Sequence, residues 1–456
     1  EVLNRVIEKA FRGSAPAQIN VPRDYWTQVI DIELPPIVRF ERQGGGKEAI
    51  ENAAKLLSKA KFPVILSGAG VVLGGAIDEC KKLAEKLDAP VCNGYQHNDS
   101  FPGSHPLAVG PLGYNGSKAA MELISKADVV LALGTRLNPF STLPGYGIDY
   151  WPKKATIIQV DMNPDRIGLT KKVSVGICGD AKQVAQQILD KLSSDAGNTG
   201  REERKNLIHK TKSAWLQTLS GLDHEEDDPG TVWNKEARER DKDRMSPRQA
   251  WRAIQDALPQ DAIISSDIGN NCAIGNAYPT FEKPRKYLAP GLFGPCGYGF
   301  PAILGAKIGC PDTPVVGFAG DGAFGISMNE MSSCAREEWP AITMVIFRNY
   351  QWGAEKRNSI LWFDDNFVGT ELDPELSYAK VANACGLKGV TCKTMEETTK
   401  AIKQSCEDQK KGITTFIEII LNQELGEPFR RDAMKKPVKV AGIKKEDMKK
   451  QPSLIS

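Results

Sequence analysis

The chain has 456 residues, 41% of them hydrophobic and 25% charged, which suits about three domains of an ordinary globular protein. Its 59 basic and 57 acidic residues leave a net charge of +2, so neither nucleic acid nor an anionic membrane is favoured as a partner. No apolar run approaches the roughly 20 residues of a membrane span, and the ten cysteines include no CxxC pair, so we expect free thiols in a reducing cytosol rather than zinc sites or disulfides.

The first residues have the pattern of a domain's closing elements. Residues 1–11 are predicted to form an amphipathic helix, and residues 18–21 a short strand that ends at Pro22. One helix and one strand cannot bury a core alone. We therefore expect the body of this domain to precede Glu1.

Helices and strands alternate from Lys47 onward. The apolar runs of the strands are continuous rather than alternating, which is typical of parallel strands covered on both faces. This pattern predicts an α/β fold built of parallel-sheet layers. It resumes at Ser246, an N-cap followed by Pro247 at the first helical position. Before that point the predicted helices are 48–59, 76–87, 117–125, 181–192 and 202–219, and the predicted strands are 63–67, 89–93, 128–133 and 156–161.

Glycines follow the first of these strands. Gly68, Gly70 and Gly74 are spaced one residue too widely for GxGxxG, and the next strand lacks the acidic residue that would hold a ribose. A tight strand–helix turn is therefore favoured, with nucleotide binding as the alternative. Residues 161–164 are likewise predicted to form a turn with an N-cap.

Polar clusters follow two strands of the second α/β region. Residues 314–319 form a predicted strand that leads into Gly-Asp-Gly at 320–322, with a helix predicted over 327–338. The next predicted strand, 342–347, leads into Arg-Asn-Tyr-Gln at 348–351. Both clusters thus lie at carboxyl ends of parallel strands, where open α/β sheets bind their ligands.

These clusters contain the donors of a magnesium–diphosphate site. Magnesium prefers oxygen ligands, and Asp321, the Asn349 amide and an oxygen of Gln351 would supply them. Gly320 and Gly322 let backbone N–H groups approach a diphosphate, whose charge a helix N-terminus favours. A GDG turn alone is common, but GDG between a strand and a helix, with Asn after the next strand, favours a cofactor site.

The spacing resembles the fingerprint of thiamin diphosphate enzymes, which is GDG, roughly 25–30 residues and Asn-Asn. Here 25 residues, 323–347, separate GDG from Arg348-Asn349. Arg348 replaces the first Asn of the family, whereas Asn349, which corresponds to the family's metal ligand, is retained.

Two further segments resemble the same enzymes. Residues 264–271 resemble the second diphosphate loop, and residues 294–302 resemble the stretch whose bulky apolar residue supports the bent cofactor. Cys296 takes that position, where relatives often carry Met; a buried core thiol is the alternative. The cofactor-binding residues that the resemblance implies are Gly269, Asn270, Cys296, Gly297, Gly320, Asp321, Gly322, Ala323 and Asn349.

The resemblance extends over nearly the whole chain to one family, the sulfoacetaldehyde acetyltransferases. It is carried by SSDIGNNCAIGNAYP, YLAPGLFGPCGYGFPA, FRNYQWGAEKRN, LWFDDNFVGTEL and NQELGEPFRRDAMKKP. It implies a cytoplasmic homodimer or homotetramer of taurine and organosulfonate catabolism, with thiamin diphosphate and Mg²⁺ and without FAD. The implied reaction converts sulfoacetaldehyde and phosphate to acetyl phosphate and sulfite. The cofactor carbanion adds to the aldehyde, sulfite leaves, and phosphate takes the acetyl group.

The family also implies a division of the chain. Its parts would be the end of a pyrimidine-binding domain with a linker (1–45), a Rossmann-like central domain (46–195), a charged linker (196–245), a diphosphate- and magnesium-binding domain (246–425) and a basic tail (426–456). The glutamate that activates the cofactor belongs to the pyrimidine domain, so no residue here is assigned that role. We therefore expect this chain to bind the cofactor weakly and to turn over negligibly.

The implied reaction handles two anions, a sulfonate and a phosphate. The planar fork of arginine suits both, which makes Arg348 a candidate anion binder. Weaker candidates are Lys356, Arg357, Arg430 and Arg431, for which a solvated surface cation is the alternative, and the acidic run 223–228 is predicted to be a solvated turn.

Two alternative functions remain open from the sequence. One is an acetolactate synthase-like enzyme or a 2-oxo acid decarboxylase. The other is a non-catalytic cofactor-binding fragment, or one half of a split enzyme.

Overall fold

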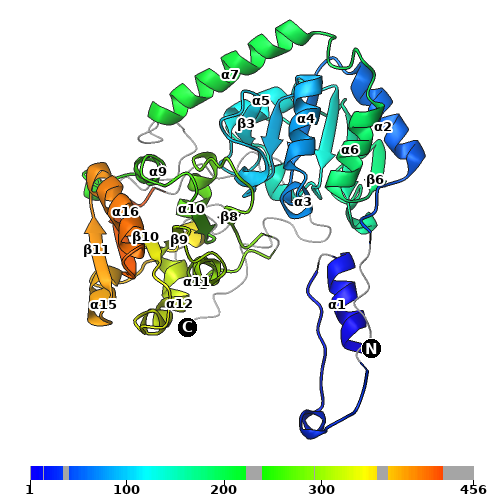
Figure 1. Ribbon diagram of the computed structural model, residues 1–456. Coiled ribbons are helices and arrows are strands. Elements are labelled where there is room, and N and C mark those ends of the chain that lie inside the picture. Colours follow the sequence, from blue (N-terminus) through cyan, green and yellow to red (C-terminus); the bar gives the residue numbers. More distant parts are fainter. Residues whose placement is uncertain are drawn as a thin grey trace, which may run out of the picture.

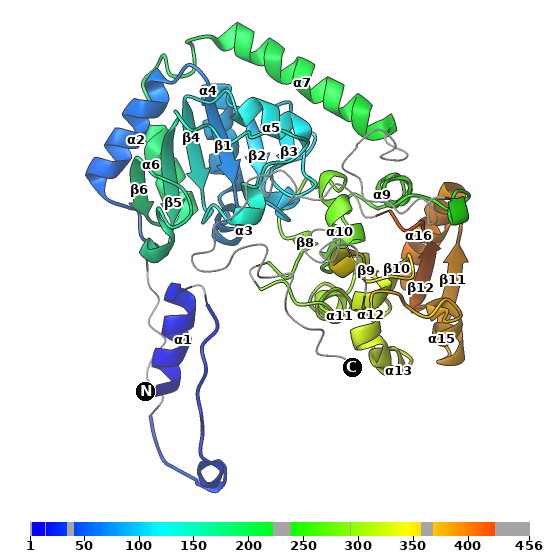
Figure 2. The same cartoon turned by 180° about the vertical axis from the view of Figure 1, so that it is seen from behind.

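Two six-stranded sheets dominate the computed structural model, which describes residues 2–13, 15–33, 41–221, 239–291, 293–356 and 368–424. Neighbouring strands in both sheets run parallel. Helices flank each sheet (Figures 1 and 2). The predicted α/β fold of parallel-sheet layers is therefore confirmed. In this part of the chain no helix has both the length and the apolar character that a membrane crossing requires.

The first sheet has the strand order β3-β2-β1-β4-β5-β6. The chain moves outward from β1 to β3 and then returns to the other side of β1, which is the order of a Rossmann-like sheet. Every residue of β1 and β4 is buried, which explains their continuous apolar runs. The strands are β1 (Pro63–Ser67), β2 (Val91–Asn93), β3 (Ala108–Pro111), β4 (Val129–Leu133), β5 (Thr156–Asp161) and β6 (Val175–Cys178).

Helices cover both faces of this sheet. Helices α2 (Lys47–Lys59) and α4 (Ile77–Leu87) both pack against α6 (Ala181–Lys191). Helix α5 (Lys118–Ile124) joins β3 to β4 in the opposite direction, and right-handed crossovers therefore place it on the other face, where it contacts α7 (Arg201–Gly221).

The glycines after β1 allow two loops to approach closely. Helix α3 (Ala69–Gly74) begins after Gly68. A Cβ atom on Gly68 or on Gly70 would lie 2.6 Å from the backbone of Gly134, its O atom in the first case and its Cα in the second. The predicted tight strand–helix turn is confirmed. The turn predicted at 161–164 is also present, with the Asn163 side chain accepting from Asp165 N at 2.9 Å.

Helix α7 is fastened to the first sheet by one buried arginine. Arg204 is 1% exposed and donates only to main-chain carbonyl oxygens in the described residues. Its planar guanidinium group donates hydrogen bonds to carbonyl groups at the ends of loops, where no helix or strand supplies a partner. The acceptors are the carbonyls of Lys61, Leu87, Asp88, Gly197 and Thr199, at 2.6–2.9 Å.

The second sheet has the strand order β11-β12-β10-β9-β7-β8. From β7 the chain passes outward to β8 and then crosses back to β9, so the order reverses between β7 and β9. Open α/β sheets bind ligands at such a reversal, outside the carboxyl ends of the strands. The strands are β7 (Ile263–Ser266), β8 (Tyr287–Leu288), β9 (Val315–Gly320), β10 (Thr343–Arg348), β11 (Lys388–Cys392) and β12 (Thr415–Ile420).

Each face of this sheet carries its own apolar core. Val316 and Phe318 point to one core, and Val315 and Ala319 to the other, because side chains alternate along a strand. The first core contains residues of α9 (Pro247–Gln255), α10 (Asn270–Ile274) and α16 (Met395–Gln409), and the second contains residues of α11 (Gly299–Gly309), α12 (Asp321–Ser327), α13 (Met331–Cys334) and α15 (Tyr378–Ala384). Helix α9 begins at the predicted N-cap Ser246, with Pro247 at its first position, and the side chain of Gln249 completes a capping box there.

Two predicted elements are wrong. Residues 18–21 form no strand, since no strand among the described residues pairs with them, although the predicted helix before them exists as α1 (Val2–Gly13). The helix predicted over 327–338 begins earlier, at Asp321, and ends at Cys334 after a short 3-10 turn. Glycines at 322 and 325 lower helix propensity, but burial of the neighbouring Phe324 overrides it.

Buried polar groups join the two sheets. The Asn98 side chain donates to the carbonyls of Asn276 and Pro279 at 2.8 and 2.9 Å, and Asp99 accepts from the main-chain N–H of Lys286 at 3.0 Å. These bonds attach the carboxyl edge of the first sheet to the segment that follows α10. By contrast, α1 and the stretch through residue 33 stand away from both sheets (Figures 1 and 2).

We predict that Arg204→Met lowers the free energy of unfolding by roughly 3 kcal/mol, because the carbonyls that Arg204 bonds lose their donor. Urea unfolding followed by circular dichroism measures the change. Lys210→Gln, an exposed position on the same helix, is the control and should stay within about 0.5 kcal/mol of wild type. Equal effects of the two substitutions would contradict the role of Arg204.

We also predict an acid sensitivity that originates at His97. Burial, helped by the Arg136 cation, lowers the pKa of His97 to about 4. The unfolded chain, with a histidine pKa of about 6.5, therefore binds a proton that the folded chain excludes, and stability falls as the pH decreases from about 6.5 to 4. His97→Gln should lose less melting temperature than wild type between about pH 7.5 and pH 5. His209→Gln, an exposed change on α7, should behave as wild type; a His97 variant that does so too would contradict the prediction.

Candidate functional site

The site lies where the second sheet reverses its strand order. The loop after β7 carries Gly269 and Asn270, the end of β9 carries Gly320 and Asp321, and the loop after β10 begins at Asn349. Since β7, β9 and β10 are consecutive neighbours, these loops emerge at one edge of the sheet. The fold thus brings together the segments that the sequence singled out.

Asp321 is held by several donors. Its Oδ2 atom accepts from the Tyr350 main-chain N–H at 2.6 Å and from Arg348 Nη1 at 3.0 Å. Its Oδ1 atom accepts from Gly322 N at 3.0 Å, and its main-chain carbonyl accepts from the Tyr378 hydroxyl at 2.9 Å. The carboxylate is 1% exposed, so its orientation is fixed by the protein.

The charge of Asp321 is balanced within the protein. Burial raises the pKa of Asp321 to about 6, and the Arg348 cation and the Tyr350 and Gly322 N–H groups limit the rise. The carboxyl is therefore mostly ionised at neutral pH and protonates as the pH falls below about 6. A ligand that needs the anion would bind more weakly as the pH falls through this range.

Arg348 is turned into the protein. It is fully buried, and Nη2 donates to the carbonyls of Asp373 and Leu376, the latter at 3.0 Å. Its Nε lies 3.8 Å from Glu418 Oε1, and its Cζ lies 4.2 Å from the centre of the Tyr350 ring. These contacts favour an ion-pair role for Arg348 over the predicted role as an anion binder.

The loop after β10 supplies the remaining oxygen donors. Asn349 is 2% exposed, and Tyr350 has a φ of +61°, which turns the chain sharply toward Gln351. Gln351 donates from Nε2 to the Gln423 carbonyl at 3.2 Å, whereas its buried Oε1 has no hydrogen-bond partner in the described residues. A buried oxygen without a partner, on the loop that also carries Asn349, is the type of donor that a hard cation such as Mg²⁺ prefers.

The loop after β7 is tied to residues 294–299 by an aspartate that the sequence analysis passed over. Asp267 Oδ1 accepts from Gly297 N at 3.1 Å, and Oδ2 accepts from Gly299 N at 2.7 Å. Burial raises the pKa of Asp267 despite these N–H donors. Gly269 itself has a φ of +137°, a conformation essentially confined to glycine. Asp267 lies inside the segment 264–271 that resembles a diphosphate loop, which was the available signal.

Cys296 precedes Gly297 on this tied loop and is exposed. The alternative of a buried core thiol is therefore wrong. Gly297 has a φ of +84°, and a Cβ atom there would lie 3.1 Å from the Ile326 side chain on α12. The predicted cofactor-supporting stretch thus adjoins the helix that begins at Asp321. All ten cysteines are free.

The glycines around Asp321 have different surroundings. A Cβ atom on Gly322 would lie 2.8 Å from the Trp352 ring, whereas a Cβ atom on Gly320 would meet nothing within 4 Å. Gly320 has φ −69° and ψ 159°, which any residue can adopt. Open space at Gly320 fits the close approach of a phosphate, while Gly322 and the buried Ala323 belong to the packing of α12.

The weaker predicted residues divide into two groups. Lys356 pairs with Glu371 and is thus not a free surface cation. Arg357, Arg430, Arg431 and the acidic run 223–228 lie outside the described residues. In the described part of the chain, no three His, Cys, Asp or Glu side chains are grouped so that they could hold a metal ion without amide or main-chain oxygens.

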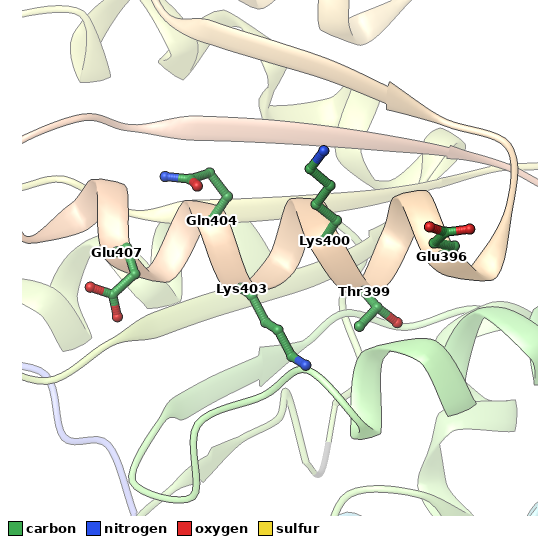
Figure 3. A pocket seen from close by; sticks show the side chains of 6 residues that line it. All are labelled: Glu396, Thr399, Lys400, Lys403, Gln404 and Glu407. Carbon is green, nitrogen blue, oxygen red and sulfur yellow. The ribbon is translucent and has the colours of Figure 1, made fainter.

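A groove of about 500 Å³ runs along α16, away from this site. Figure 3 shows its side chains leaving the helix in several directions, with acidic, basic and neutral groups mixed. None of the predicted site residues lines this groove, so it is separate from the candidate site. Its lining residues are Glu396, Thr399, Lys400, Lys403, Gln404 and Glu407.

Comparison with protein-family models gives two matches. Residues 50–188 match the model "Thiamine pyrophosphate enzyme, central domain", and residues 267–419 match "Thiamine pyrophosphate enzyme, C-terminal TPP binding domain". Thiamine pyrophosphate and thiamin diphosphate are the same cofactor.

Known proteins are similar over almost the whole chain. A probable sulfoacetaldehyde acetyltransferase of Rhizobium meliloti is 78% identical over 451 residues, which are 99% of this chain and 76% of that protein. A sulfoacetaldehyde acetyltransferase of Roseovarius nubinhibens is 75% identical, over 99% of this chain and 75% of that protein. A probable acetolactate synthase large subunit of Methanocaldococcus jannaschii is 29% identical, over 89% of this chain and 67% of that protein.

The two glycines beside Asp321 give a matched pair of substitutions. Gly322→Ala should cost about 1–3 kcal/mol of stability, because its methyl group meets the Trp352 ring. Gly320→Ala should stay within about 0.5 kcal/mol of wild type but raise the dissociation constant for thiamin diphosphate roughly tenfold. Thermal melts without cofactor and titration calorimetry with it measure the two effects. If Gly320→Ala left the dissociation constant for thiamin diphosphate unchanged, the open space at Gly320 would not be the place where a phosphate binds.

Proposed function

The chain belongs to the sulfoacetaldehyde acetyltransferase family of thiamin diphosphate enzymes, and from this we propose that it converts sulfoacetaldehyde and phosphate to acetyl phosphate and sulfite. The observation that carries the proposal is the convergence of Asp321, Asn349 and Gln351 at the strand-order reversal. It is supported by 78% identity to a relative named for this activity. The more distant similarity to an acetolactate synthase subunit fits a shared cofactor.

The residues of this edge would hold the cofactor through its diphosphate. We propose that Asp321, Asn349 and an oxygen of Gln351 bind Mg²⁺, and that the loops at Gly269–Asn270 and at Gly320 lie against the phosphates. The bound cofactor supplies a carbanion that adds to the aldehyde and an electron sink for the loss of sulfite. The protein's task at this edge is to fix the diphosphate end, because small displacements of a reacting group are costly in rate.

Other parts of the proposal rest on the family resemblance. We propose a central domain over 46–195, a diphosphate-binding domain over 246–425, a homodimer or homotetramer, and a cytoplasmic location. Asn98 and Asp99 support a fixed relation between the two domains, because they bond the segment that follows α10. Cys296 and Gly297, on the loop tied by Asp267, are proposed to lie against the cofactor.

We predict that sulfite release from sulfoacetaldehyde requires phosphate, thiamin diphosphate and Mg²⁺, and that it is measurable when a pyrimidine-binding domain with the activating glutamate is present together with this chain. Asp321→Asn should reduce this rate to less than about one hundredth of wild type, because the neutral amide holds the metal poorly. The matched control is Asp312→Asn, which changes an exposed carboxylate in the turn before β9 and should retain activity. Acetolactate formed from pyruvate in place of sulfite would favour the acetolactate synthase alternative. Cofactor binding without either product would favour the non-catalytic alternative.

A further inference from the structure

The Arg348 guanidinium connects two buried carboxylates. Nη1 lies 3.0 Å from Asp321 Oδ2, and Nε lies 3.8 Å from Glu418 Oε1. All three side chains are at most 2% exposed. A buried charge is tolerated only when it is paired and hydrogen-bonded, so each member of this set depends on the others.

The donors at Asp321 are distributed unequally over its two oxygens. A carboxylate offers about four acceptor positions, two on each oxygen. Arg348 and the Tyr350 N–H occupy both positions of Oδ2, whereas in the described residues only the Gly322 N–H reaches Oδ1. One position of Oδ1 therefore remains for another ligand. The two oxygens of a carboxylate are equivalent, so the contacts from Arg348 Nη1 and the Tyr350 N–H fix the orientation of the group: the oxygen that faces them is saturated, and the other oxygen keeps the open position.

Glu418 faces Arg348 as a counter-charge at 3.8 Å, without a hydrogen bond, because Arg348 Nε has no hydrogen-bond partner among the described residues. It lies within β12, opposite Ile346 of β10, and is the one acid in an otherwise apolar strand apart from the leading threonine. Its Oε1 accepts from Tyr378 N at 3.1 Å and its Oε2 from the Ser377 hydroxyl at 2.7 Å. These bonds attach Glu418 to the start of α15, whose Tyr378 hydroxyl also bonds the Asp321 carbonyl.

We propose that Arg348 is a positioning residue that saturates Asp321 Oδ2 and so presents Oδ1 to the metal ion, with Glu418 as the counter-charge that keeps the guanidinium in place. The proposal rests on the proposed function, because it assigns the metal to Asp321. A shorter residue with a single amide group, such as asparagine, could not contact both carboxylates. Arginine can, because its side chain is longer and its guanidinium group has several donors.

A purely electrostatic role and a positioning role of Arg348 predict opposite effects of its removal on metal affinity. Arg348 is a cation next to the metal site, so its removal should strengthen metal binding if only Coulomb forces matter. If Arg348 orients the ligand, its removal should weaken metal binding. The three side chains carry a formal charge of −1, and the double substitution Arg348→Gln/Glu418→Gln leaves this value unchanged. The double variant thus isolates geometry from charge.

The test uses Mn²⁺ as the probe, added to the full chain in the presence of saturating thiamin diphosphate. Its dissociation constant and its electron paramagnetic resonance spectrum report the affinity and the symmetry of the ligand set. Both Arg348→Gln and the double variant should bind Mn²⁺ about tenfold more weakly or worse, with an altered spectrum. Glu418→Gln should show a smaller change of the same sign. Arg336→Gln, which removes an exposed Arg–Glu pair, is the control and should bind as wild type.

Each outcome supports or overturns the proposal. Tighter binding by Arg348→Gln, or wild-type affinity and spectrum in the double variant, would overturn it. Asp321→Asn separates it from the proposed function. If that variant also binds Mn²⁺ normally, the metal site itself is wrongly placed, whereas if it loses Mn²⁺ while the Arg348 variants do not, only the positioning role fails. Circular dichroism checks folding, and the double variant, which leaves fewer buried charges unpaired, serves if Arg348→Gln does not fold.

Discussion

A carboxylate cannot remain ionised inside a protein unless donors or cations compensate the loss of water. At Asp321 this condition is met by two main-chain N–H groups and one guanidinium, and the positions of these groups depend on three neighbouring strands. Asp321 begins the helix after β9, Arg348 ends β10, and Glu418 lies in β12. The sheet order that places β10 between β9 and β12 is therefore what allows Asp321 to remain ionised here.

The space around the glycines at the two strand-order reversals explains why the candidate site is on the second sheet. The first sheet also reverses its strand order. There, however, the backbone of Gly134 occupies the space beside Gly68 and Gly70, so the two loops pack against each other. At the second reversal a Cβ on Gly269 or on Gly320 would meet nothing within 4 Å. The first sheet instead supports the second through buried hydrogen bonds from Asn98 and Asp99.

The sequence was sufficient where a signal is local. Continuous apolar runs located β1 and β5 at 63–67 and 156–161, and GDG with a later Asn indicated which loops meet. It was insufficient where a contact depends on register or on a partner. Glu418 pairs with Arg348 only because β12 lies beside β10, and no local sequence pattern predicts that neighbourhood. The single acidic residue in an apolar strand was the one available indication. Residues 18–21 had a strand's composition, but a strand needs a neighbour to pair with, and the described residues offer none. The direction of the Arg348 side chain was likewise set by its surroundings rather than by its residue type.

An arginine beside the proposed divalent-cation site would weaken cation binding unless its charge were offset. Without Glu418, the positive charge of Arg348 would cancel the negative charge of Asp321. The resulting neutral pair would attract a cation only weakly. With Glu418 the buried group keeps a formal charge of −1. The arginine can then restrain the ligand geometrically without removing the electrostatic attraction. On this proposal Arg348 and Glu418 act as one unit, in which the glutamate supplies the charge balance and the arginine supplies the orientation, and neither would serve the proposed metal ligand Asp321 alone.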